Sequence, residues 1–261
     1  MKTAGFIGTG KMGGALANAV SKRFGGEEIL LYDADNKKAE ALAETLGANS
    51  VSLEYLLKNS KYIFLGVKPQ VLESVLKEIK CEFNFESVIV SMAAGFSIER
   101  IENILGKAKI IRIMPNTPVE VEKGMIVYDY NAYVEASDVN DFENMLEFAG
   151  EIDHISENLI DAASALSGSG PAFTYMFIEA MADAGVKCGL PRDKAIKFAA
   201  QTVMGASELL LKSGKHPGQL KDDVCSPGGT TIEGVKTLEE HAFRGAVIDT
   251  ISKTYDKNKK L

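Results

Sequence analysis

Residues 5–13 read Gly-Phe-Ile-Gly-Thr-Gly-Lys-Met-Gly, the most informative stretch of this 261-residue chain. An apolar run typical of a buried strand leads into it, and an amphipathic helical pattern follows it. Gly8 permits a tight turn, Gly10 lets the main chain approach a pyrophosphate, and Gly13 allows a helix to pack closely on a strand. The phosphates would meet free N–H groups at the positive end of that helix. The stretch predicts a dinucleotide site rather than a glycine-rich turn without a ligand, and the expected contacts are Gly8, Thr9, Gly10, Lys11, Met12 and Gly13.

The second apolar run ends at Asp33, twenty residues after Gly13, the usual distance for the acidic residue that binds the ribose. A carboxylate there accepts a hydrogen bond from the 2′-hydroxyl of NADH. It would repel the 2′-phosphate of NADPH by roughly 1–4 kcal/mol at ~4 Å. Asn36, Lys37 and Lys38 would offset that repulsion if they turn inward. The residues alone leave NADH and NADPH open.

Short apolar runs alternate with amphipathic stretches along the first half of the chain. The expected strands are Ala4–Gly8, Ile29–Asp33, Tyr62–Gly66, Val88–Met92, Lys109–Met114, Met125–Tyr130 and Glu151–Ile155. The expected helices are Gly13–Arg23, Lys37–Leu46, Val71–Ile79 and Ile98–Leu105. Strands separated by helices of this length imply right-handed crossovers and a mostly parallel sheet. We therefore expect a doubly wound α/β Rossmann domain over residues 1–157.

Two more loops should face the same crevice, because ligands bind at the carboxyl ends of the strands in such sheets. The contacts expected from these loops are Val67, Lys68, Pro69, Ala93, Ala94 and Gly95. Lys68 either lies near a nicotinamide or is a surface lysine, and the small side chains of Ala93–Gly95 leave room for a ring. The turn Met114–Pro118, with two prolines around an amide, is either a ligand loop or a rigid structural turn.

The second half of the chain carries only helical patterns. The expected helices are Pro171–Ala184, Pro191–Lys212, Thr230–Glu240 and Phe243–Tyr255. Several of them are apolar around much of their circumference, which favours burial against a second subunit over a tight monomeric core. We therefore expect an all-α domain over residues 158–261.

Two segments of this half are hard to explain by packing alone. Leu166–Ala172 is expected to be a loop with many free main-chain donors before a helix. Asp222–Glu233 contains Pro227-Gly228-Gly229, a sharp turn into a helix that begins with Thr230 and Thr231. A helix N-terminus with bare glycine amides binds anions, and a threonine there adds one directed hydrogen bond or serves as a helix cap.

Composition narrows the class of protein further. A formal charge of −7 without a long Lys/Arg cluster argues against nucleic-acid binding. The longest uncharged run, Ala162–Ile178, is interrupted by glycines and a proline and is too short for a membrane span. Cys81, Cys188 and Cys225 are far apart and odd in number, so we expect a reducing, cytoplasmic location and no metal site. The three histidines are scattered, and no serine or cysteine lies in a nucleophile turn.

Taken in order, these motifs closely resemble those of the pyrroline-5-carboxylate reductase family, over essentially the whole chain. The segments that carry the resemblance are Gly5–Gly13, Val67–Pro69, Met114–Pro118, Ser167–Ala172, Phe177–Asp183, His216–Lys221 and Val224–Ile232. The resemblance implies a Rossmann domain followed by a helical dimerisation domain. It implies a homodimer, assembled in some members into a larger ring such as a decamer, in which the helical half of one subunit contributes to its partner's site.

The resemblance also implies the last step of proline biosynthesis, hydride transfer from a nicotinamide to the ring C=N carbon of 1-pyrroline-5-carboxylate. By resemblance, Thr231 is the hydroxyl near the imine nitrogen, and the substrate carboxylate is held by Ser226, Gly228, Gly229 and Thr230. Family members commonly have a small polar residue where Asp33 stands, and many prefer NADPH. The resemblance thus implies NADPH, while Asp33 keeps NADH open.

Two other functions fit the glycine motif. One is a reductase or dehydrogenase of another small imino or hydroxy acid, because a Rossmann half by itself does not identify the substrate. The other is a dinucleotide-binding sensor without catalysis, which would bind cofactor but show no substrate-dependent absorbance change. The intact Ser226–Thr231 turn argues against the sensor.

Overall fold

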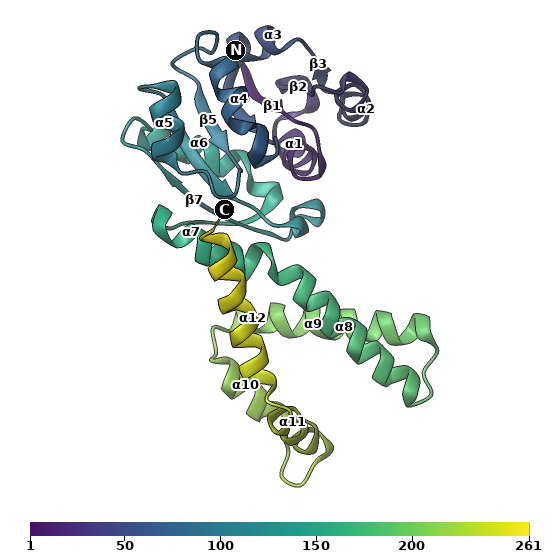
Figure 1. Ribbon diagram of the computed structural model, residues 1–261. Coiled ribbons are helices and arrows are strands. Elements are labelled where there is room, and N and C mark those ends of the chain that lie inside the picture. Colours follow the sequence, from purple (N-terminus) through teal and green to yellow (C-terminus); the bar gives the residue numbers. More distant parts are fainter. Residues whose placement is uncertain (261) are drawn as a thin grey trace. The chain divides into compact units, whose positions relative to one another are not determined.

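The computed structural model describes residues 1–260 (Figure 1). Contacts between residues divide the chain into two compact units. The first comprises Met1–Ser169 with the residues from Thr254 onward, and the second comprises Gly170–Lys253. Every strand of residues 1–260 lies in the first unit.

The first unit is built on one eight-stranded sheet with the order β3-β2-β1-β4-β5-β6-β7-β8. Its strands are β1 (Lys2–Ile7), β2 (Ile29–Tyr32), β3 (Asn49–Ser50), β4 (Ser60–Leu65), β5 (Val88–Ser91), β6 (Lys109–Met114), β7 (Gly124–Tyr130) and β8 (Gly150–His154). All neighbours pair in parallel except β6 and β7, which are antiparallel. The expected mostly parallel sheet is confirmed.

Helices cover both faces of this sheet. They are α1 (Lys11–Phe24), α2 (Asn36–Leu46), α3 (Leu53–Asn59), α4 (Pro69–Ile79), α5 (Ile98–Leu105), α6 (Ala136–Met145) and α7 (Glu157–Ala163). Buried side chains of α1, α2 and α6 share one apolar cluster with the sheet, and those of α3, α4 and α5 share another. Two apolar layers against a parallel sheet are the doubly wound arrangement, so the expected fold class is confirmed.

The central strands are buried on both faces, which explains their continuous apolar sequences. The rings of Phe6 on β1 and Phe64 on β4 stack with their centroids 4.5 Å apart. Four elements of the first unit were not among the expected ones: β3, α3, α6 and α7. The helix α3 begins at Ser52, whose hydroxyl accepts a hydrogen bond from the main-chain N–H of Tyr55 at 3.3 Å. Such a cap is a local signal, but a seven-residue helix leaves little periodicity to detect.

The second unit is helical. Its helices are α8 (Gly170–Lys187), α9 (Arg192–Ser213), α10 (Pro217–Val224), α11 (Thr230–Glu240) and α12 (Phe243–Asn258), the last of which continues into the first unit. The expected helices are confirmed, and α10 is additional. No helix within residues 1–260 is long and apolar enough to cross a membrane.

The expectation of a loop at Leu166–Ala172 is wrong. The chain forms a π-helical turn at Ser164–Gly168 and continues directly into α8 at Gly170. The N–H of Ser169 donates to the carbonyl of Ser164 at 3.0 Å. A wider helical turn therefore uses main-chain donors that a loop would have left free, which glycine and serine signals in the sequence do not reveal.

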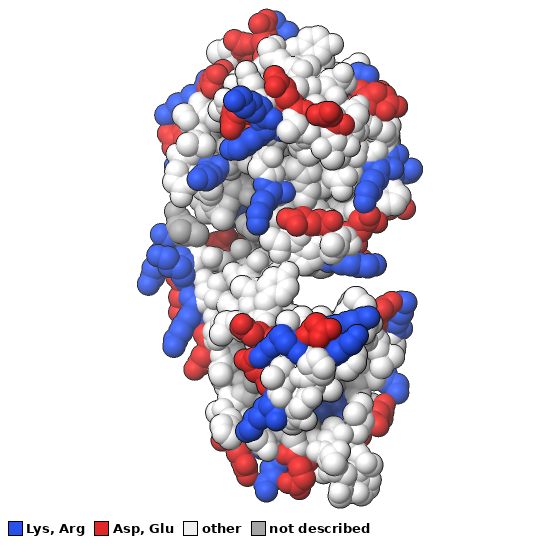
Figure 2. All heavy atoms as spheres, turned by 90° about the vertical axis from the view of Figure 1, so that its right-hand side faces the viewer, with Lys and Arg blue, Asp and Glu red and all other residues white. Residues whose placement is uncertain are grey.

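The surface mixes charges of both signs. On the face drawn in Figure 2, Lys and Arg side chains lie among Asp and Glu side chains, with areas between them that carry neither. Ion pairs join many of the Lys and Arg side chains to Asp or Glu, and most of these pairs are solvent-exposed, for example Lys58–Glu54 and Lys212–Glu208. This face shows no large field of a single sign of the kind that binds a phosphate backbone.

Candidate functional site

The strand order reverses direction at β1. From β1 the chain goes to β2 on one side, and β4 lies on the other side of β1. In such sheets ligands bind at the carboxyl ends of the strands where the order reverses. The loops Gly8–Gly13 and Gly66–Pro69 follow β1 and β4, so they meet at this point.

Three glycines make that meeting possible. The N–H of Gly66 donates to the carbonyl of Ile7 at 2.8 Å. A Cβ atom on Gly8 would lie 2.8 Å from the main chain of Gly66, and one on Gly13 would lie 2.1 Å from the carbonyl oxygen of Gly8. Gly8 also has a φ of +96°, which L-residues rarely adopt. The sequence assigned roles to Gly8 and Gly13, but the role of Gly66 depends on the neighbouring strand.

The N-terminus of α1 is open to a ligand. Its N-cap, Gly10, provides no side-chain cap, and a Cβ atom there would meet nothing within 4 Å. The first turn of α1 carries no acidic residue, and Lys11 is exposed. Met12 packs against the core instead. Free N–H groups, open space and absence of negative charge in this turn fit a phosphate group.

The carboxylate of Asp33 joins the glycine loop to the end of β2. Its Oδ2 accepts hydrogen bonds from the main-chain N–H of Thr9 at 2.8 Å and from the Thr9 hydroxyl at 3.1 Å. Its Oδ1 accepts from the N–H of Asp35 at 2.9 Å. Burial alone would raise the pKa of Asp33, but these hydrogen bonds outweigh it and hold the pKa below its ordinary value. Asp33 is thus ionised at neutral pH, beside the loop that would hold the phosphates.

The cations expected near Asp33 are exposed. Lys37 and Lys38 lie in the first turn of α2, and the ammonium of Lys38 is 3.6 Å from the carboxylate of Asp35. Lys38 therefore faces a carboxylate of its own turn, which weakens its effect on a nearby anion.

The two other nucleotide loops differ in exposure. Lys68 is an exposed, extended N-cap, and Pro69 occupies the first position of α4, where its missing N–H costs nothing. In the second loop Ala93 is buried in the core, whereas Ala94 is half-buried and Gly95 is exposed with a φ of +70°. Any ligand contact of this loop therefore falls on its outer residues.

The turn Met114–Pro118 has a structural explanation. The side-chain oxygen of Asn116 accepts from the N–H of Met125 at 2.8 Å, and its amide nitrogen donates to the carbonyl of Ser167 at 3.0 Å. Asn116 thus joins three separate segments of the first unit, which accounts for an amide held between two prolines.

In the second unit, the turn before α11 presents an open helix N-terminus. Gly228 has a φ of +68°, and the N–H of Gly229 donates to the carbonyl of Ser226 at 3.0 Å. Gly229 is the N-cap of α11 without a side-chain cap, and Thr230 and Thr231 are exposed. The turn brings the five expected residues together, with free N–H groups and hydroxyls in one place. Neither threonine caps the helix, so both hydroxyls are available to a ligand.

Within residues 1–260, no three His, Cys, Asp or Glu side chains gather as a potential metal site.

Family models match both parts of the chain. Residues 157–261 match a model described as "Pyrroline-5-carboxylate reductase dimerisation", and residues 3–95 match one described as "NADP oxidoreductase coenzyme F420-dependent". The second match covers the glycine loop, Asp33 and both further nucleotide loops.

Whole-chain relatives agree with these models. The chain is 44% identical to pyrroline-5-carboxylate reductase of Escherichia coli, over 100% of this chain and 98% of the relative. It is 40% identical to the Aquifex aeolicus protein of the same name, over 98% and 96%. Among solved structures, Plasmodium falciparum pyrroline carboxylate reductase with NADP bound superimposes with a TM-score of 0.87 at 33% identity, covering 99% of this chain and 97% of that one.

Proposed function

The chain belongs to the pyrroline-5-carboxylate reductase family, and from this membership we propose that it reduces 1-pyrroline-5-carboxylate to L-proline. The reaction adds a hydride to the ring C=N carbon and a proton to the ring nitrogen. A reduced nicotinamide dinucleotide supplies the hydride when bound. The observation that carries the proposal is whole-chain similarity to these reductases, together with an open glycine turn against β4.

The chain's own residues have two tasks in this reaction, binding and orientation. The N–H groups of Gly10–Gly13 would hold the pyrophosphate, with Val67–Pro69 and the outer residues Ala94 and Gly95 bordering the nicotinamide. Val67 and Lys68 lie where the loop leaves β4, next to the glycine turn. These assignments follow from the strand order, since all three loops leave the same edge of the sheet.

The substrate would bind at the turn before α11. The free N–H groups around Gly228, Gly229 and Thr230, with the hydroxyl of Ser226, would hold the substrate carboxylate. The hydroxyl of Thr231 would hydrogen-bond to the ring nitrogen, the atom that carries the added proton. Support comes from the uncapped helix N-terminus and the exposed hydroxyls of this turn.

The preferred cofactor in this proposal is NADH. The carboxylate of Asp33 is fixed by three donors and ionised, and its remaining lone pairs can accept a hydrogen bond from a ribose 2′-hydroxyl. The donors that Thr9 would offer to a 2′-phosphate are already bound to Asp33. A 2′-phosphate would also meet repulsion of roughly 1–4 kcal/mol at ~4 Å.

The proposed assembly is a homodimer formed through residues 158–261, with residues 1–157 as the nucleotide domain. Support comes from the dimerisation model and from large apolar side chains left exposed on α8 and α9, such as Tyr175, Phe198 and Leu211. Assembly of dimers into a ring such as a decamer, and a cytoplasmic location suggested by three free cysteines, are further parts of the proposal.

One assay tests the reaction and the cofactor together. Oxidation of NADH and of NADPH is followed by absorbance with pyrroline-5-carboxylate as substrate, and with open-chain keto and hydroxy acids for comparison. We expect turnover with the cyclic imine only, and a higher kcat/KM with NADH. Absence of turnover with either dinucleotide would refute the reaction, whereas a preference for NADPH would refute only the role of Asp33.

A further inference from the structure

The first residue of the segment that matches the dimerisation model makes an unexpected contact with a nucleotide loop. Glu157 begins α7, a helix of the first unit whose Ile160 is fully buried. Its Oε1 accepts a hydrogen bond from the main-chain N–H of Ile98 at 2.7 Å. Ile98 is the first residue of α5, directly after the loop that contains Ala93–Gly95. One carboxylate oxygen therefore connects two segments that are 59 residues apart.

The same oxygen is held by a buried cation. Nη1 of Arg112 lies 2.9 Å from Oε1 of Glu157, and Nη2 lies 3.3 Å from Oδ1 of Asp161, one turn further along α7. The side chain of Arg112 is only 5% exposed. Separating a buried guanidinium from its carboxylate partner costs free energy, because the buried charge is then left unpaired. The ion pair with Arg112 therefore restricts the movement of the Glu157 side chain.

Neighbouring strands complete the arrangement. Arg112 is paired across β6 and β7 with Asp129, whose Oδ2 accepts from the N–H of Glu157 at 2.6 Å. On its other side Arg112 is paired with Ser91, the last residue of β5, from which the Ala93–Gly95 loop departs. The position of Glu157 is thus fixed by its main chain and its side chain at once.

Glu157 acts on the far end of that loop. Between Ser91 and Ile98 the chain is anchored by the buried side chains of Ala93 and Phe96, and Ser97 accepts from the N–H of Arg100 at 3.2 Å. The first N–H of α5 would otherwise have no acceptor within its own helix. Ser97 caps α5, and the hydrogen bond to Glu157 supplies the acceptor for Ile98 and ties the start of α5, and with it the end of the loop, to α7.

We propose that Glu157 is a positioning residue for the dinucleotide, which holds the Ala93–Gly95 loop in its binding geometry by bonding Ile98 while Arg112 holds Glu157. The proposal rests on the proposed function, which places this loop beside the nicotinamide. It predicts that the start of the dimerisation segment and the affinity for dinucleotide are coupled through a single side chain.

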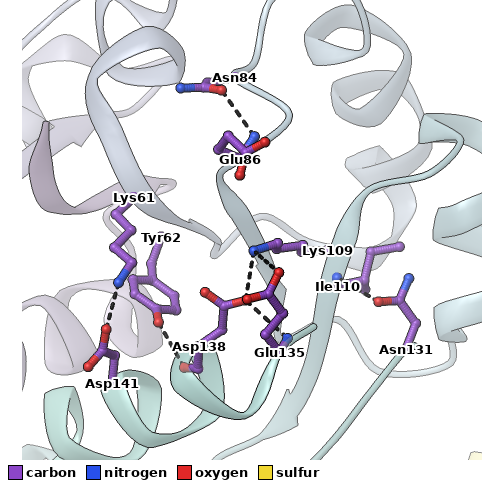
Figure 3. A network of polar contacts seen from close by, with 10 residues as sticks. All are labelled: Lys61, Tyr62, Asn84, Glu86, Lys109, Ile110, Asn131, Glu135, Asp138 and Asp141. Carbon is purple, nitrogen blue, oxygen red and sulfur yellow. Dashed lines mark hydrogen bonds and ion pairs between the residues drawn. The ribbon is translucent and has the colours of Figure 1, made fainter. Parts of the chain in front are cut away.

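A buried carboxylate at the opposite ends of the strands provides a matched control. Asp138 is a buried carboxylate whose Oδ2 accepts from the ammonium of Lys109 at 2.9 Å and from the main-chain N–H of Glu135 at 3.1 Å. Figure 3 shows these groups meeting at the start of β6, three residues before Arg112. Tyr62 donates to the main-chain carbonyl of Asp138 at 2.8 Å in the same network. Asp138 thus has the same kind of partners as Glu157 but lies away from the nucleotide loops, which leave the strands' other ends.

The test compares Glu157→Gln and Glu157→Ala with Asp138→Asn. The dissociation constant of NADH is measured for each full-length protein from NADH fluorescence, without substrate, alongside Tm and molar mass by light scattering. For Glu157→Ala we expect the dissociation constant to rise about tenfold, the order of one hydrogen bond to a charged group. Glu157→Gln, which keeps an acceptor for Ile98, should show a smaller rise at unchanged molar mass. Asp138→Asn should lower Tm and leave NADH binding within about twofold of wild type.

Two outcomes would overturn the proposal. One is unchanged NADH binding by Glu157→Ala or, if that variant does not fold, by Glu157→Gln. The other is an equal loss of binding in Asp138→Asn, which would mean that any weakening of the sheet has this effect. Because NADH binding is measured without substrate, a wild-type protein that binds NADH but fails to reduce pyrroline-5-carboxylate would contradict the reaction and leave this test decisive.

Discussion

The two units of the chain bury apolar side chains very differently. In the first, large residues such as Phe6, Phe64 and Tyr62 are at most 1% exposed, in layers on both faces of the sheet. In the second, the fully buried apolar residues are three alanines: Ala182, Ala195 and Ala199. Large side chains of its helices are exposed instead, up to 79% for Leu211.

The first unit thus has a complete hydrophobic core, whereas the second leaves large apolar side chains exposed within the single chain. The first unit buries its large apolar side chains within a single chain. The helices of the second pack closely through alanines and leave an apolar surface that water disfavours. The match of residues 157–261 to a dimerisation model supports burial of that surface in an oligomer. Stability of the second unit should therefore depend on protein concentration, and that of the first should not.

The largest expected effect is on the core of the first unit. Phe64→Ala removes a fully buried ring that stacks on Phe6 and should cost about 3–5 kcal/mol of unfolding free energy. Urea unfolding should show this loss equally at low and high protein concentration. Phe198→Ala removes the same atoms from an exposed site on α9, so its cost should grow with the fraction of dimer. Equal, concentration-independent losses in both variants would remove the distinction between the units.

The next effect concerns association. Phe198→Glu introduces a charge on the apolar face of α9 and should weaken the dimer by roughly 2 kcal/mol or more. Light scattering should show monomers at concentrations where wild type is dimeric. Lys197→Glu, which places the same charge at the neighbouring exposed position, is the control and should leave the dimer intact. A dimer unaffected by Phe198→Glu would contradict the role of this face.

A third prediction separates chemistry from association in the second unit. Thr231→Ala should lower kcat/KM about 10- to 100-fold, as expected for one hydrogen bond to a charged partner worth roughly 1.5–3 kcal/mol. Molar mass and Tm should not change, because the Thr231 side chain is exposed. Thr237→Ala is the control on the same helix, since its hydroxyl bonds only the carbonyl of Glu233 at 3.0 Å. Unchanged kinetics in Thr231→Ala would exclude its hydroxyl from the reaction.

In the first unit, Asp33→Ser should change cofactor preference without affecting the dimer. Removing the carboxylate frees the donors of Thr9 and removes repulsion of a 2′-phosphate. The ratio of affinities for 2′,5′-ADP and 5′-ADP should rise about tenfold, or ~1.4 kcal/mol. Calorimetry measures both affinities directly. An unchanged ratio of the two affinities would show that Asp33 does not determine selectivity at the ribose 2′ position.

The smallest effect is pH-dependent. The hydrogen bond to Asp138 outweighs burial and raises the pKa of Lys109 above its ordinary value of 10.5. The resulting stability, roughly 1 kcal/mol or less, is fully present below pH 10.5 and is lost as pH rises through the higher folded-state pKa. The urea midpoint of wild type should therefore fall more between pH 9 and pH 11 than that of Lys109→Met. An equal fall of the urea midpoint in both proteins would show that the Lys109–Asp138 pair does not contribute to stability.

The sequence allowed prediction of the elements with long, regular patterns and of the glycines in the first turn. Gly8, Gly10 and Gly13 could be assigned because a strand, a turn and a helix follow one another directly. The π-helical turn at Ser164–Gly168 was missed, because the same residues are typical of loops. The short helix α10 was missed because none of its residues is buried, so it lacks the apolar stripe that revealed the equally short α5.

The contacts between distant segments could not be predicted in this way. The amino-acid pattern indicates that Asp33 ends a strand, since this property depends on neighbours along the chain. It does not reveal that Asp33 bonds Thr9, or that Glu157 bonds Ile98 and Arg112. Those partners are determined by the strand order, which sets β1 beside β2 and β6 beside β5 and β7. Hydrogen bonds act over about 3 Å, so only packing in three dimensions selects which of many possible donors and acceptors meet.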